Sequence, residues 1–441
     1  MATQRGGQSR WRKPVPGETA GTLRGRRSAR PRIRGDSRRA PVVVCGAGAA
    51  GIAAALSAAR CGERVCLVES TARLGGTVPA ALIHTLAGLY NQTGDLLHRG
   101  LVAELVERLA RQAAAVRRRM GRLWVLSVCP NRYRRVVANW VEWEPRITVL
   151  SNSRVSRLTA QDGRILDVEV STPGGRCRLV PKALIDATGA AAVVRLIGPG
   201  LVQRDTDRPL AGWIFRLRGV GPAALDFPRG PGIARALENA VAEEILPPAC
   251  APTWIDCGVL PDEAFVKLSL PLGNDEHDLE SRGQLKRQMR QVQAAIVAFL
   301  RGLPGFSAAS LKQTGRPTAR DAGRIHGEYC LSAADVRQAR KFQDAACPGC
   351  WPIEYWDPQR GVSLDYLPAG DYYEIPLRSL LVKGLSNVWT AGRSLCADKF
   401  AQASARVAGT CWAMGEAVGK AAAAATRLSE GGACEPLQSL S

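Results

Sequence analysis

Gly46, Gly48 and Gly51 form the pattern GxGxxG directly after an apolar run at 42–45, and Glu69 follows Gly46 by 23 positions. In such a pattern the first glycine permits a tight turn, the second lets backbone N–H groups approach a pyrophosphate, and the third lets a helix pack closely on a strand. An acidic side chain at this distance can accept hydrogen bonds from a ribose diol. The spacing therefore predicts a dinucleotide site, with the phosphates at the N-terminus of a helix.

The apolar pattern around the glycines predicts the elements that position them. Residues 42–45 are expected to form a buried strand, the alanine-rich run that ends near Gly62 a helix, and residues 64–69 a second strand, which together make one βαβ unit. Further along the chain we expect a long basic helix at 96–120, short strands across 146–179, a buried strand with a tight exit at 180–189, strands at 213–217, 265–270 and 387–390, and helices at 279–303 and 406–427.

Several further segments resemble one superfamily of flavoproteins. RLGGT at 73–77, IDATG at 185–189 and VWTAGRSL at 388–395 are similar to motifs of the glutathione-reductase-like FAD flavoproteins. Within that superfamily, GRIHGEY at 323–329, YYEIPLRSLL at 372–381 and the small-residue stretch at 401–419 resemble the FAD-dependent oxidoreductases grouped with xanthan-lyase-like and heterodisulfide-reductase-A-like proteins. The resemblance covers residues 41–427 approximately. It implies FAD as the cofactor and leaves the substrate open.

The pattern and the resemblance together imply an α/β fold, with a Rossmann-like FAD-binding domain of the glutathione-reductase type and an inserted α+β substrate domain. The expected division comprises a disordered basic tail at 1–40, the first part of the FAD-binding domain at 41–197 with a β-meander near 146–180, the substrate domain at 198–375, the second part of the FAD-binding domain at 376–427, and a flexible tail at 428–441. A length of 441 residues suits two or three lobes.

The resemblance assigns FAD contacts to residues of the matching motifs. The expected cofactor-binding residues are Gly46, Ala47, Gly48, Ala49, Ala50, Gly51, Glu69, Ser70, Arg73, Gly75, Gly76, Thr77, His84, Ala187, Thr188, Gly189, Gly392, Arg393, Arg406 and Val407. A helix that begins near Arg406 and Val407 would direct its positive end to the N1/O2 edge of the flavin. Arg393 departs from the family pattern, because many members carry an acidic residue there that binds the ribityl chain.

Oxidation of a substrate by a flavin needs a group that removes a proton while the hydride leaves. His326 is the candidate base because imidazole titrates near neutrality, and Tyr373, Glu374 and Arg378 complete the expected catalytic set. The alternative for His326 is a histidine satisfied at the surface or in the core, and the alternative for Arg378 is a structural ion pair with Glu374.

Three further features could bear on the chemistry. Arg320 and Arg324 are expected to clamp a substrate carboxylate, although loop arginines often serve structure alone. His84, in ALIHTLAG, resembles the His-Thr of succinate dehydrogenase and fumarate reductase flavoproteins, so a covalent FAD link, a place near the flavin and an ordinary loop position all stay open. Cys347 and Cys350 form the single CxxC, which suits either reversible disulfide chemistry or a simple turn.

The charge and the cysteine content bound the partners. The net charge is +21, but residues 1–40 alone contribute +10, from twelve Arg and Lys against Glu18 and Asp36. A nucleic acid held by this tail and by the basic clusters at 117–119 and 132–135 is therefore an alternative that we do not favour. Thirteen cysteines without a framework spacing favour the cytoplasm. Four histidines and one CxxC predict no metal site, and the lack of a long apolar run predicts no membrane span.

The expected function is that of an FAD-dependent oxidoreductase, a dehydrogenase or oxidase that transfers hydride from a small polar metabolite to flavin N5. No second GxGxxG between a strand and a helix follows residue 100, whereas two-nucleotide disulfide reductases need a separate NAD(P)H domain. Three alternatives stay open: a flavoprotein that modifies or binds RNA, a flavin monooxygenase or halogenase-like enzyme, and a non-catalytic electron-transfer flavoprotein with a redox partner protein.

Overall fold

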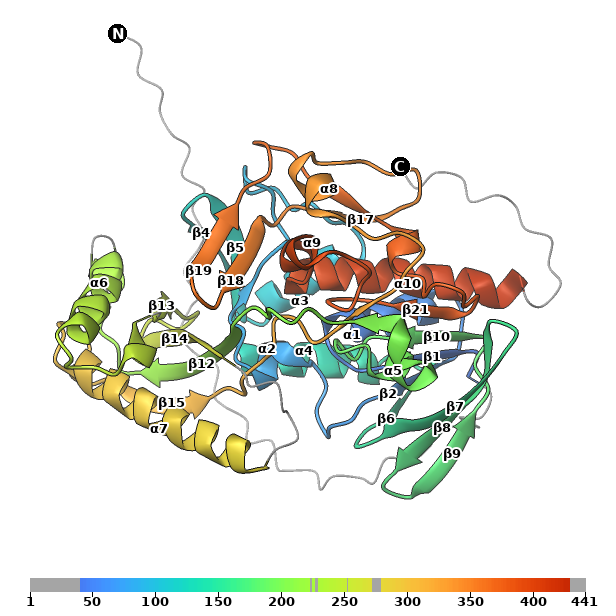
Figure 1. Ribbon diagram of the computed structural model, residues 1–441, viewed down its shortest axis with the longest axis horizontal. Coiled ribbons are helices and arrows are strands. Elements are labelled where there is room, and N and C mark those ends of the chain that lie inside the picture. The colour runs from blue at the N-terminus through green and yellow to red at the C-terminus, as the bar shows by residue number, and fades with distance from the viewer. Residues whose placement is uncertain (1–39, 223, 227–228, 252, 272–278, 429–441) are drawn as a thin grey trace, which may run out of the picture.

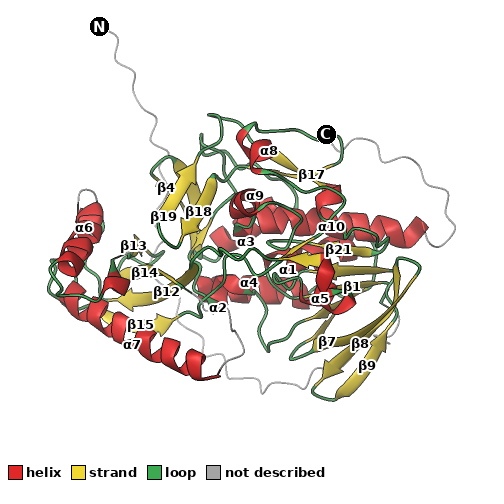
Figure 2. Cartoon of the chain, in the orientation of Figure 1, coloured by secondary structure: helices red, strands yellow, loops and turns green. Residues whose placement is uncertain are grey.

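The computed structural model of the chain describes residues 40–222, 224–226, 229–251, 253–271 and 279–428 (Figure 1). The predictions for the two tails lie outside these residues, except at positions 40 and 428. The described helices and strands form a larger body around a parallel sheet and a smaller lobe at one end (Figure 2).

A five-stranded parallel sheet forms the centre of the larger body. Its strands lie in the order β21 (Val388–Thr390), β10 (Ala183–Asp186), β1 (Val42–Cys45), β2 (Val65–Val68) and β6 (Ile147–Leu150). The strands expected at 42–45, 64–69, 180–189 and 387–390 are therefore confirmed. Because β10 pairs with both β1 and β21, the glycine loop and the turn after β21 share the carboxyl edge of the sheet.

The two faces of the sheet are covered by different elements. Val42 and Val44 face helices α1 (Ala49–Arg60) and α10 (Ala408–Leu428), which pack against each other. Val43 and Cys45 face the other side, where the β-meander of β7 (Arg154–Gln161), β8 (Arg164–Thr172) and β9 (Gly175–Leu179) contributes to a second core. This alternation follows from the two-residue period of a strand. The short strands expected across 146–179 are confirmed.

The long helix expected at 96–120 is wrong. Helix α3 covers only Leu101–Arg111, and the chain continues as strand β4 (Ala115–Met120), which pairs with β5 (Leu123–Val128) beside β3 (Thr85–Leu86). Ala113 lies between them with φ +46°, a left-handed conformation that ends the helix. The buried residues of α3 follow helical spacing, whereas no residue of β4 is buried and β4 is held by its pairing with β5.

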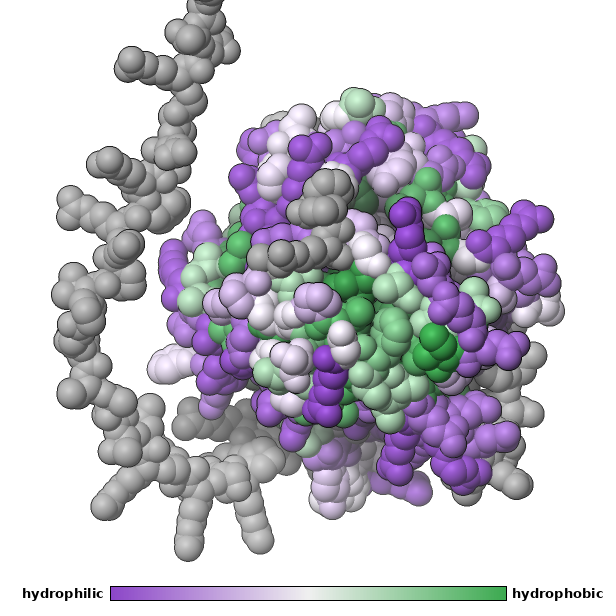
Figure 3. Space-filling view, turned by 90° about the vertical axis from the view of Figure 1, so that its left-hand side faces the viewer, coloured by the Kyte–Doolittle hydropathy of each residue, from purple (hydrophilic) through white to green (hydrophobic). Residues whose placement is uncertain are grey.

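The smaller lobe is an antiparallel sheet covered by two helices. Its strands lie in the order β13 (Trp254–Cys257), β14 (Glu263–Leu270), β12 (Ala211–Arg218) and β15 (Ser310–Thr314), and α6 (Arg229–Ala242) and α7 (Leu279–Arg301) pack on it (Figure 1). Its hydrophobic core comprises residues between 213 and 309 and is separate from the core around α1. The elements expected at 213–217, 265–270 and 279–303 are confirmed. On this end of the molecule apolar residues gather between hydrophilic margins (Figure 3).

The chain then returns to the larger body. Strand β16 (Arg324–Ile325) pairs with β11 (Val202–Gln203), β17 (Ala345–Gly349) with β20 (Tyr373–Pro376), and β18 (Ile353–Asp357) with β19 (Gly361–Asp365). The remaining α-helices described are the longer α4 (Pro130–Glu142) and the short α2 (Thr77–Ala80), α5 (Ala192–Ile197), α8 (Ala333–Arg337) and α9 (Lys399–Ala405). Buried residues of β18 and β20 join the core around α1, while the domain boundaries at 198 and 375 stay predictions.

Replacing Gly415 by valine should destabilise the fold. A Cβ at Gly415 would lie 2.1 Å from the Ala50 carbonyl oxygen, so α10 would have to move away from α1. We expect the free energy of unfolding in urea to fall by about 1–3 kcal/mol, the usual cost of overpacking. Lys420→Ala, on the exposed side of the same helix, should change it by under about 0.5 kcal/mol. Equal stability of the two variants would contradict this packing.

Candidate cofactor and substrate site

The glycine loop after β1 is fixed by backbone contacts that leave no room for side chains. Gly46 has φ +97°, and a Cβ there would lie 2.6 Å from the Ala187 carbonyl oxygen. A Cβ at Gly51 would lie 1.8 Å from the Gly46 carbonyl oxygen, which shows how closely α1 approaches the strand. Both positions therefore require glycine for the fold itself.

Gly48 differs from the other two, because its open side faces away from the protein. A Cβ at Gly76 would lie 2.5 Å from the Gly48 Cα, whereas a Cβ at Gly48 would meet no atom closer than 3.9 Å. Gly48 is the N-cap of α1, so Ala49 and Ala50 begin the helix and their N–H groups lack partners within it. Gly48 and Gly76 thus form a backbone cradle at a helix N-terminus, which suits a pyrophosphate.

Glu69, at the end of β2, is tied to the glycine loop. Its Oε2 accepts the Ala47 N–H at 2.8 Å, and its Oε1 accepts the Thr71 N–H at 2.8 Å and the Ser70 hydroxyl at 3.3 Å. The carboxylate is buried and keeps lone pairs for a further donor. Among the other residues expected near it, Gly75 donates its N–H to the Ala47 carbonyl, Thr77 begins α2 and Arg73 is exposed.

The turn after β10 is organised by Asp186, which is fully buried. Its Oδ1 accepts the Thr188 N–H at 3.0 Å and the Thr188 hydroxyl at 2.7 Å, and its Oδ2 accepts the N–H groups of Val193 and Val194 at 2.8 and 3.0 Å. Ala187, Thr188 and Gly189 are thereby held beside Gly46. Sequence reasoning did not assign Asp186 a role, although it lies inside the IDATG segment.

The turn after β21 brings Arg393 against the inserted lobe. Gly392 has φ +94°, and a Cβ there would lie 3.2 Å from the Cβ of Ala50. The Arg393 guanidinium donates to the Gly189 carbonyl, and also to the Ala319 carbonyl at 2.6 Å. Arg393 therefore joins the carboxyl edge of the sheet to the segment that leaves the lobe.

Two further arginines lie at this junction. Arg320 donates to the Leu210 carbonyl and to the Ser269 hydroxyl at 3.3 Å, and its guanidinium stacks 4.1 Å from the centroid of the Trp356 ring. Arg406 donates to the Glu354 carbonyl at 3.2 Å, two residues before α10 begins. Burial, together with the charge of Arg406, lowers the pKa of Arg320 to about 9. Burial also lowers the pKa of Arg406.

Glu354 is the carboxylate whose charge acts on both Arg320 and Arg406, and both of its oxygens accept hydrogen bonds from indole groups. Glu354 accepts the indole N–H of Trp351 at 2.8 Å and that of Trp356 at 2.7 Å. Its charge raises the pKa of Arg320 and of Arg406 but does not offset burial. Glu354 is a member of the junction that sequence reasoning missed, and no local signal marks it.

The N-terminus of α10 lies beside the segment that follows β3. Val407 precedes the helix, and the Gly409 N–H donates to the Ala87 carbonyl at 2.9 Å. Thr410, in the first turn, has a buried hydroxyl oxygen without a hydrogen-bond partner among the described residues. An orphaned hydroxyl and the open backbone cradle are features that a bound polar cofactor would complete.

His84 belongs to the larger body and contacts the smaller lobe. Its ring stacks on Phe265 of the lobe, with centroids 4.0 Å apart and planes 6° apart, and its Nε2 lies 3.1 Å from the Asp256 carboxylate. Asp256 also pairs with Lys267 at 2.5 Å. Burial lowers the pKa of His84, against the opposing effect of Asp256. These contacts assign His84 to the packing of the lobe, while its expected part in FAD binding stays a prediction.

The four residues expected to be catalytic are spread over separate environments. His326 is exposed. Tyr373 is fully buried with its hydroxyl 2.8 Å from that of Ser404, and Glu374 accepts the Phe342 N–H at 2.7 Å. Arg378 pairs with Asp344 at 3.2 Å, not with Glu374. We call the place where Arg320, Arg393 and Arg406 meet the lobe segment the arginine junction. Within the described residues, no hydrogen bond joins any of the four expected catalytic residues to these arginines.

Arg324, the other expected substrate residue, is buried in an ion-pair network. Its guanidinium contacts Asp205 at 2.5 Å and Asp321 at 3.1 Å, and donates to the Ala397 carbonyl at 2.7 Å. Because its donors already have these partners, Arg324 holds β16 against the chain after β21. Of the two expected clamp residues, the structure brings only Arg320 to the arginine junction.

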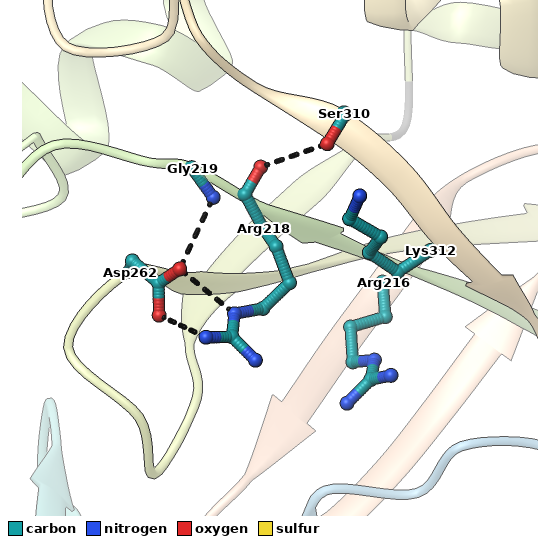
Figure 4. A pocket seen from close by; sticks show the side chains of 6 residues that line it. All are labelled: Arg216, Arg218, Gly219, Asp262, Ser310 and Lys312. Carbon is teal, nitrogen blue, oxygen red and sulfur yellow. Dashed lines mark hydrogen bonds and ion pairs between the residues drawn. The ribbon is translucent and has the colours of Figure 1, made fainter.

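A separate cavity of about 580 Å³ lies on the lobe sheet, lined by Arg216, Arg218, Gly219, Asp262, Ser310 and Lys312 (Figure 4). Arg218 pairs with Asp262 at 2.7 Å, and Arg216 pairs with the buried Glu263 at 3.0 Å. Both guanidinium charges are therefore balanced locally. Arg320 and Arg406 have no such carboxylate ion pair among the described residues, so the arginine junction is the stronger candidate for the substrate site.

Part of the basic cluster at 117–119, which we considered as a nucleic-acid contact, binds other segments of the protein. Arg117 donates to the Gly94 carbonyl, and Arg118 to the carbonyls of Cys257 and Gly258, so part of the basic cluster at 117–119 holds the protein together. No cluster of three or more His, Cys, Asp or Glu in the described ranges is placed to hold a metal ion. None of the described helices is long and apolar enough to cross a membrane.

The sequence as a whole matches one family. Residues 41–431 match the family model described as FAD dependent oxidoreductase, so the chain belongs to this family, and FAD is its cofactor. The match covers the larger body and the inserted lobe together, in agreement with an FAD-binding domain that carries an insertion. No curated protein matches the chain.

Solved structures similar to the chain include other flavin enzymes. A geranylgeranyl bacteriochlorophyll reductase-like protein from Thermoplasma acidophilum is 13% identical, with 89% of this chain and 79% of that one covered and a TM-score of 0.48. A flavin-dependent brominase triple mutant is 13% identical over 90% and 82%, with a TM-score of 0.44. The p-nitrophenol 4-monooxygenase of Pseudomonas putida DLL-E4 is 15% identical over 66% and 69%, with a TM-score of 0.36.

Replacing Gly48 by valine should remove FAD without unfolding the protein. The Cβ at this position meets no protein atom within 3.9 Å, but the side chain would fill the cradle that faces Gly76. We expect at least about tenfold weaker FAD binding, or about 1.4 kcal/mol, in a flavin-fluorescence titration. Gly51→Val serves as the contrast, because its clash at 1.8 Å should prevent folding. Full FAD loading of Gly48→Val would refute this placement.

The contact of His84 with the lobe should make stability depend on pH. Its pKa is lowered in the folded state, so the fold binds fewer protons than the unfolded chain, and stability falls as the pH drops below about 6.5. We expect the free energy of unfolding in urea to fall between about pH 7.5 and 5.5 more steeply for the wild type than for His84→Gln, by up to about 1.4 kcal/mol per pH unit. Parallel pH profiles of the two proteins would exclude this role.

Proposed function

We propose that the chain oxidises a small anionic metabolite and passes a hydride from that substrate to FAD. One observation carries the anionic part of this proposal. Arg320 and Arg406 are two half-buried arginines, the charge of Arg406 lowers the pKa of Arg320, and among the described residues neither has a carboxylate ion-pair partner. An anion bound between them would supply the missing charge.

The cost of burying these charges supports this view. Removing a charged group from water costs several kcal/mol even after relaxation, and a neighbouring like charge adds to it. Among the described residues, Arg320 and Arg406 donate hydrogen bonds only to carbonyl and hydroxyl oxygens. A carboxylate accepts two parallel hydrogen bonds from a guanidinium, which neutral acceptors match poorly. The junction is therefore better suited to an anion than to a neutral substrate.

The residues around the junction have distinct parts in the proposal. Gly48 and Gly76 would hold the pyrophosphate of FAD, and Arg406 with the N-terminus of α10 would face the ring. Bound FAD supplies a hydride acceptor at N5. Arg320, stacked on Trp356, would orient the substrate anion, and the lobe would exclude water from it. Arg393 would keep the lobe segment in place through the Ala319 carbonyl.

The residue that accepts the substrate proton stays a prediction. His326, Tyr373, Glu374 and Arg378 stay the predicted catalytic residues. The buried hydroxyl of Tyr373 and the ion pair of Arg378 with Asp344 favour structural roles for these two. His326 is exposed and would have to reach the substrate from outside the core.

Anaerobic titration of the FAD-loaded protein tests the proposal. We expect small carboxylates from a metabolite panel to bleach the flavin absorbance, while their amide or ester analogues do not. Arg320→Gln should keep its FAD and need about 10–100-fold more substrate for half-maximal reduction, the loss expected for a charged hydrogen bond of about 1.5–3 kcal/mol. Arg178→Gln, an exposed arginine paired with Asp167, is the control and should behave as the wild type.

Two outcomes would contradict the proposal. If no member of the panel bleaches the flavin of a fully loaded protein, an electron-transfer flavoprotein becomes the better explanation. If neutral analogues reduce the flavin as well as the carboxylates do, and Arg320→Gln has no effect, the anionic substrate is excluded.

A further inference from the structure

Two cysteines that are 66 positions apart in the sequence lie side by side where β16 and the turn after β21 meet. Leu331 forms a parallel bridge with Ala397, in which the Leu331 N–H donates to the Cys396 carbonyl at 3.1 Å and the Asp398 N–H to the Leu331 carbonyl at 2.9 Å. Cys330 and Cys396, each one residue earlier, are therefore lateral neighbours. Neighbouring strands are roughly 4.8 Å apart, inside the roughly 4.4–6.8 Å between Cα atoms that a disulfide spans.

The thiols of Cys330 and Cys396 interact with each other. The Cys330 thiol donates a hydrogen bond to the Cys396 sulfur, and both cysteines are free thiols. This hydrogen bond, the Gly327 N–H and the Arg324 guanidinium stabilise a thiolate at Cys396 and lower its pKa to about 7, against the effect of burial. The same hydrogen bond raises the pKa of Cys330. The pair therefore releases its first proton near neutrality, and the thiolate is centred on Cys396.

The two thiols differ in access to solvent. Cys330 is exposed, whereas Cys396 is 3% exposed. A small oxidant can therefore reach Cys330, while the partner that Cys396 can reach is Cys330 itself. An exposed and a buried thiol in contact make the arrangement of an entry cysteine and a resolving cysteine.

We propose that Cys330 and Cys396 are a reversible dithiol–disulfide site that is oxidised by a low-molecular-weight disulfide of the glutathione type. The Cys330 proton passes to Cys396, and the Cys330 thiolate attacks one sulfur of glutathione disulfide and releases one glutathione thiolate. Cys396 then loses the proton to water, attacks the Cys330 sulfur and releases the second glutathione thiolate. The protein loses two electrons and two protons, and one glutathione disulfide becomes two thiols. This site is independent of the proposed substrate oxidation.

The CxxC motif lacks the features of this pair. Cys347 and Cys350 are both buried, and burial raises the pKa of both thiols, that of Cys350 to about 12. The Cys350 thiol donates to the Tyr90 carbonyl at 3.2 Å. Neither thiol is available to a solvent-borne disulfide in the folded state, so these two cysteines provide the matched comparison.

The full-length, FAD-loaded protein should be incubated with glutathione disulfide, then unfolded in denaturant that contains the alkylating agent, digested and mapped by mass spectrometry. We expect a peptide pair linked through Cys330 and Cys396, loss of alkylation at these two positions and recovery of both after dithiothreitol. Cys347→Ser should give the same link at the same rate. Mapping also separates this link from any that involves Cys434, which lies outside the described residues.

Two single variants test the order of the steps. Cys396→Ser should stop at Cys330 carrying one glutathione, and Cys330→Ser should leave Cys396 unmodified because oxidant does not reach it. FAD content, measured by absorbance, should match the wild type in both and shows that each variant is folded. The proposal is overturned if Cys330 and Cys396 in the wild type are alkylated equally before and after oxidation, or if wild-type Cys330 accumulates glutathione as fully as it does in Cys396→Ser.

Discussion

The buried carboxylate of Asp186 is the interaction on which the carboxyl edge of the sheet depends. It accepts four hydrogen bonds from Thr188, Val193 and Val194, and its backbone carbonyl accepts the Thr390 hydroxyl and the Ala391 N–H. The turns after β10 and β21 are thus fixed to each other by one residue. A carboxylate this deep is tolerable because its hydrogen bonds replace water. Removing it would leave the N–H groups of Thr188, Val193 and Val194 without these acceptors at the carboxyl edge of the sheet.

The site is built from distant parts of the chain, and each joint depends on a contact to a neighbouring segment. Arg393 extends the ordered edge from the Gly189 carbonyl to the Ala319 carbonyl of the lobe segment. His84 does the same from the opposite side through Asp256 and Phe265. These contacts, with those of Arg118 to the Cys257 and Gly258 carbonyls, anchor the lobe to the FAD-binding body. The lobe has a hydrophobic core of its own, so these contacts determine how it lies against the larger body.

The sequence predicted those features that backbone sterics impose locally. Gly46 and Gly51 are demanded by contacts of 2.6 and 1.8 Å that any Cβ would break, so their spacing identified the βαβ unit correctly. The helix expected at 96–120 failed because periodicity alone does not reveal a reversal at Ala113. Partners such as Asp256 for His84 are over 100 positions away, and no local pattern specifies them. The CxxC spacing suggested a redox pair, but Cys347 and Cys350 are both buried. Cys330 and Cys396 share no motif and are neighbours only through the bridge between Leu331 and Ala397.

The arginine junction connects electrostatics to the way the lobe is held. In the chain by itself, Arg320 and Arg406 are stabilised by neutral acceptors, each worth about 1.5–3 kcal/mol when bonded to a charged donor. Burying each ion costs several kcal/mol, so neutral acceptors alone offset that cost only in part. Because Leu210 and Ser269 of the lobe supply the acceptors for Arg320, the same balance governs how firmly the lobe is held. Under the proposed function, an anion that neutralises the junction would hold the lobe more firmly against the larger body.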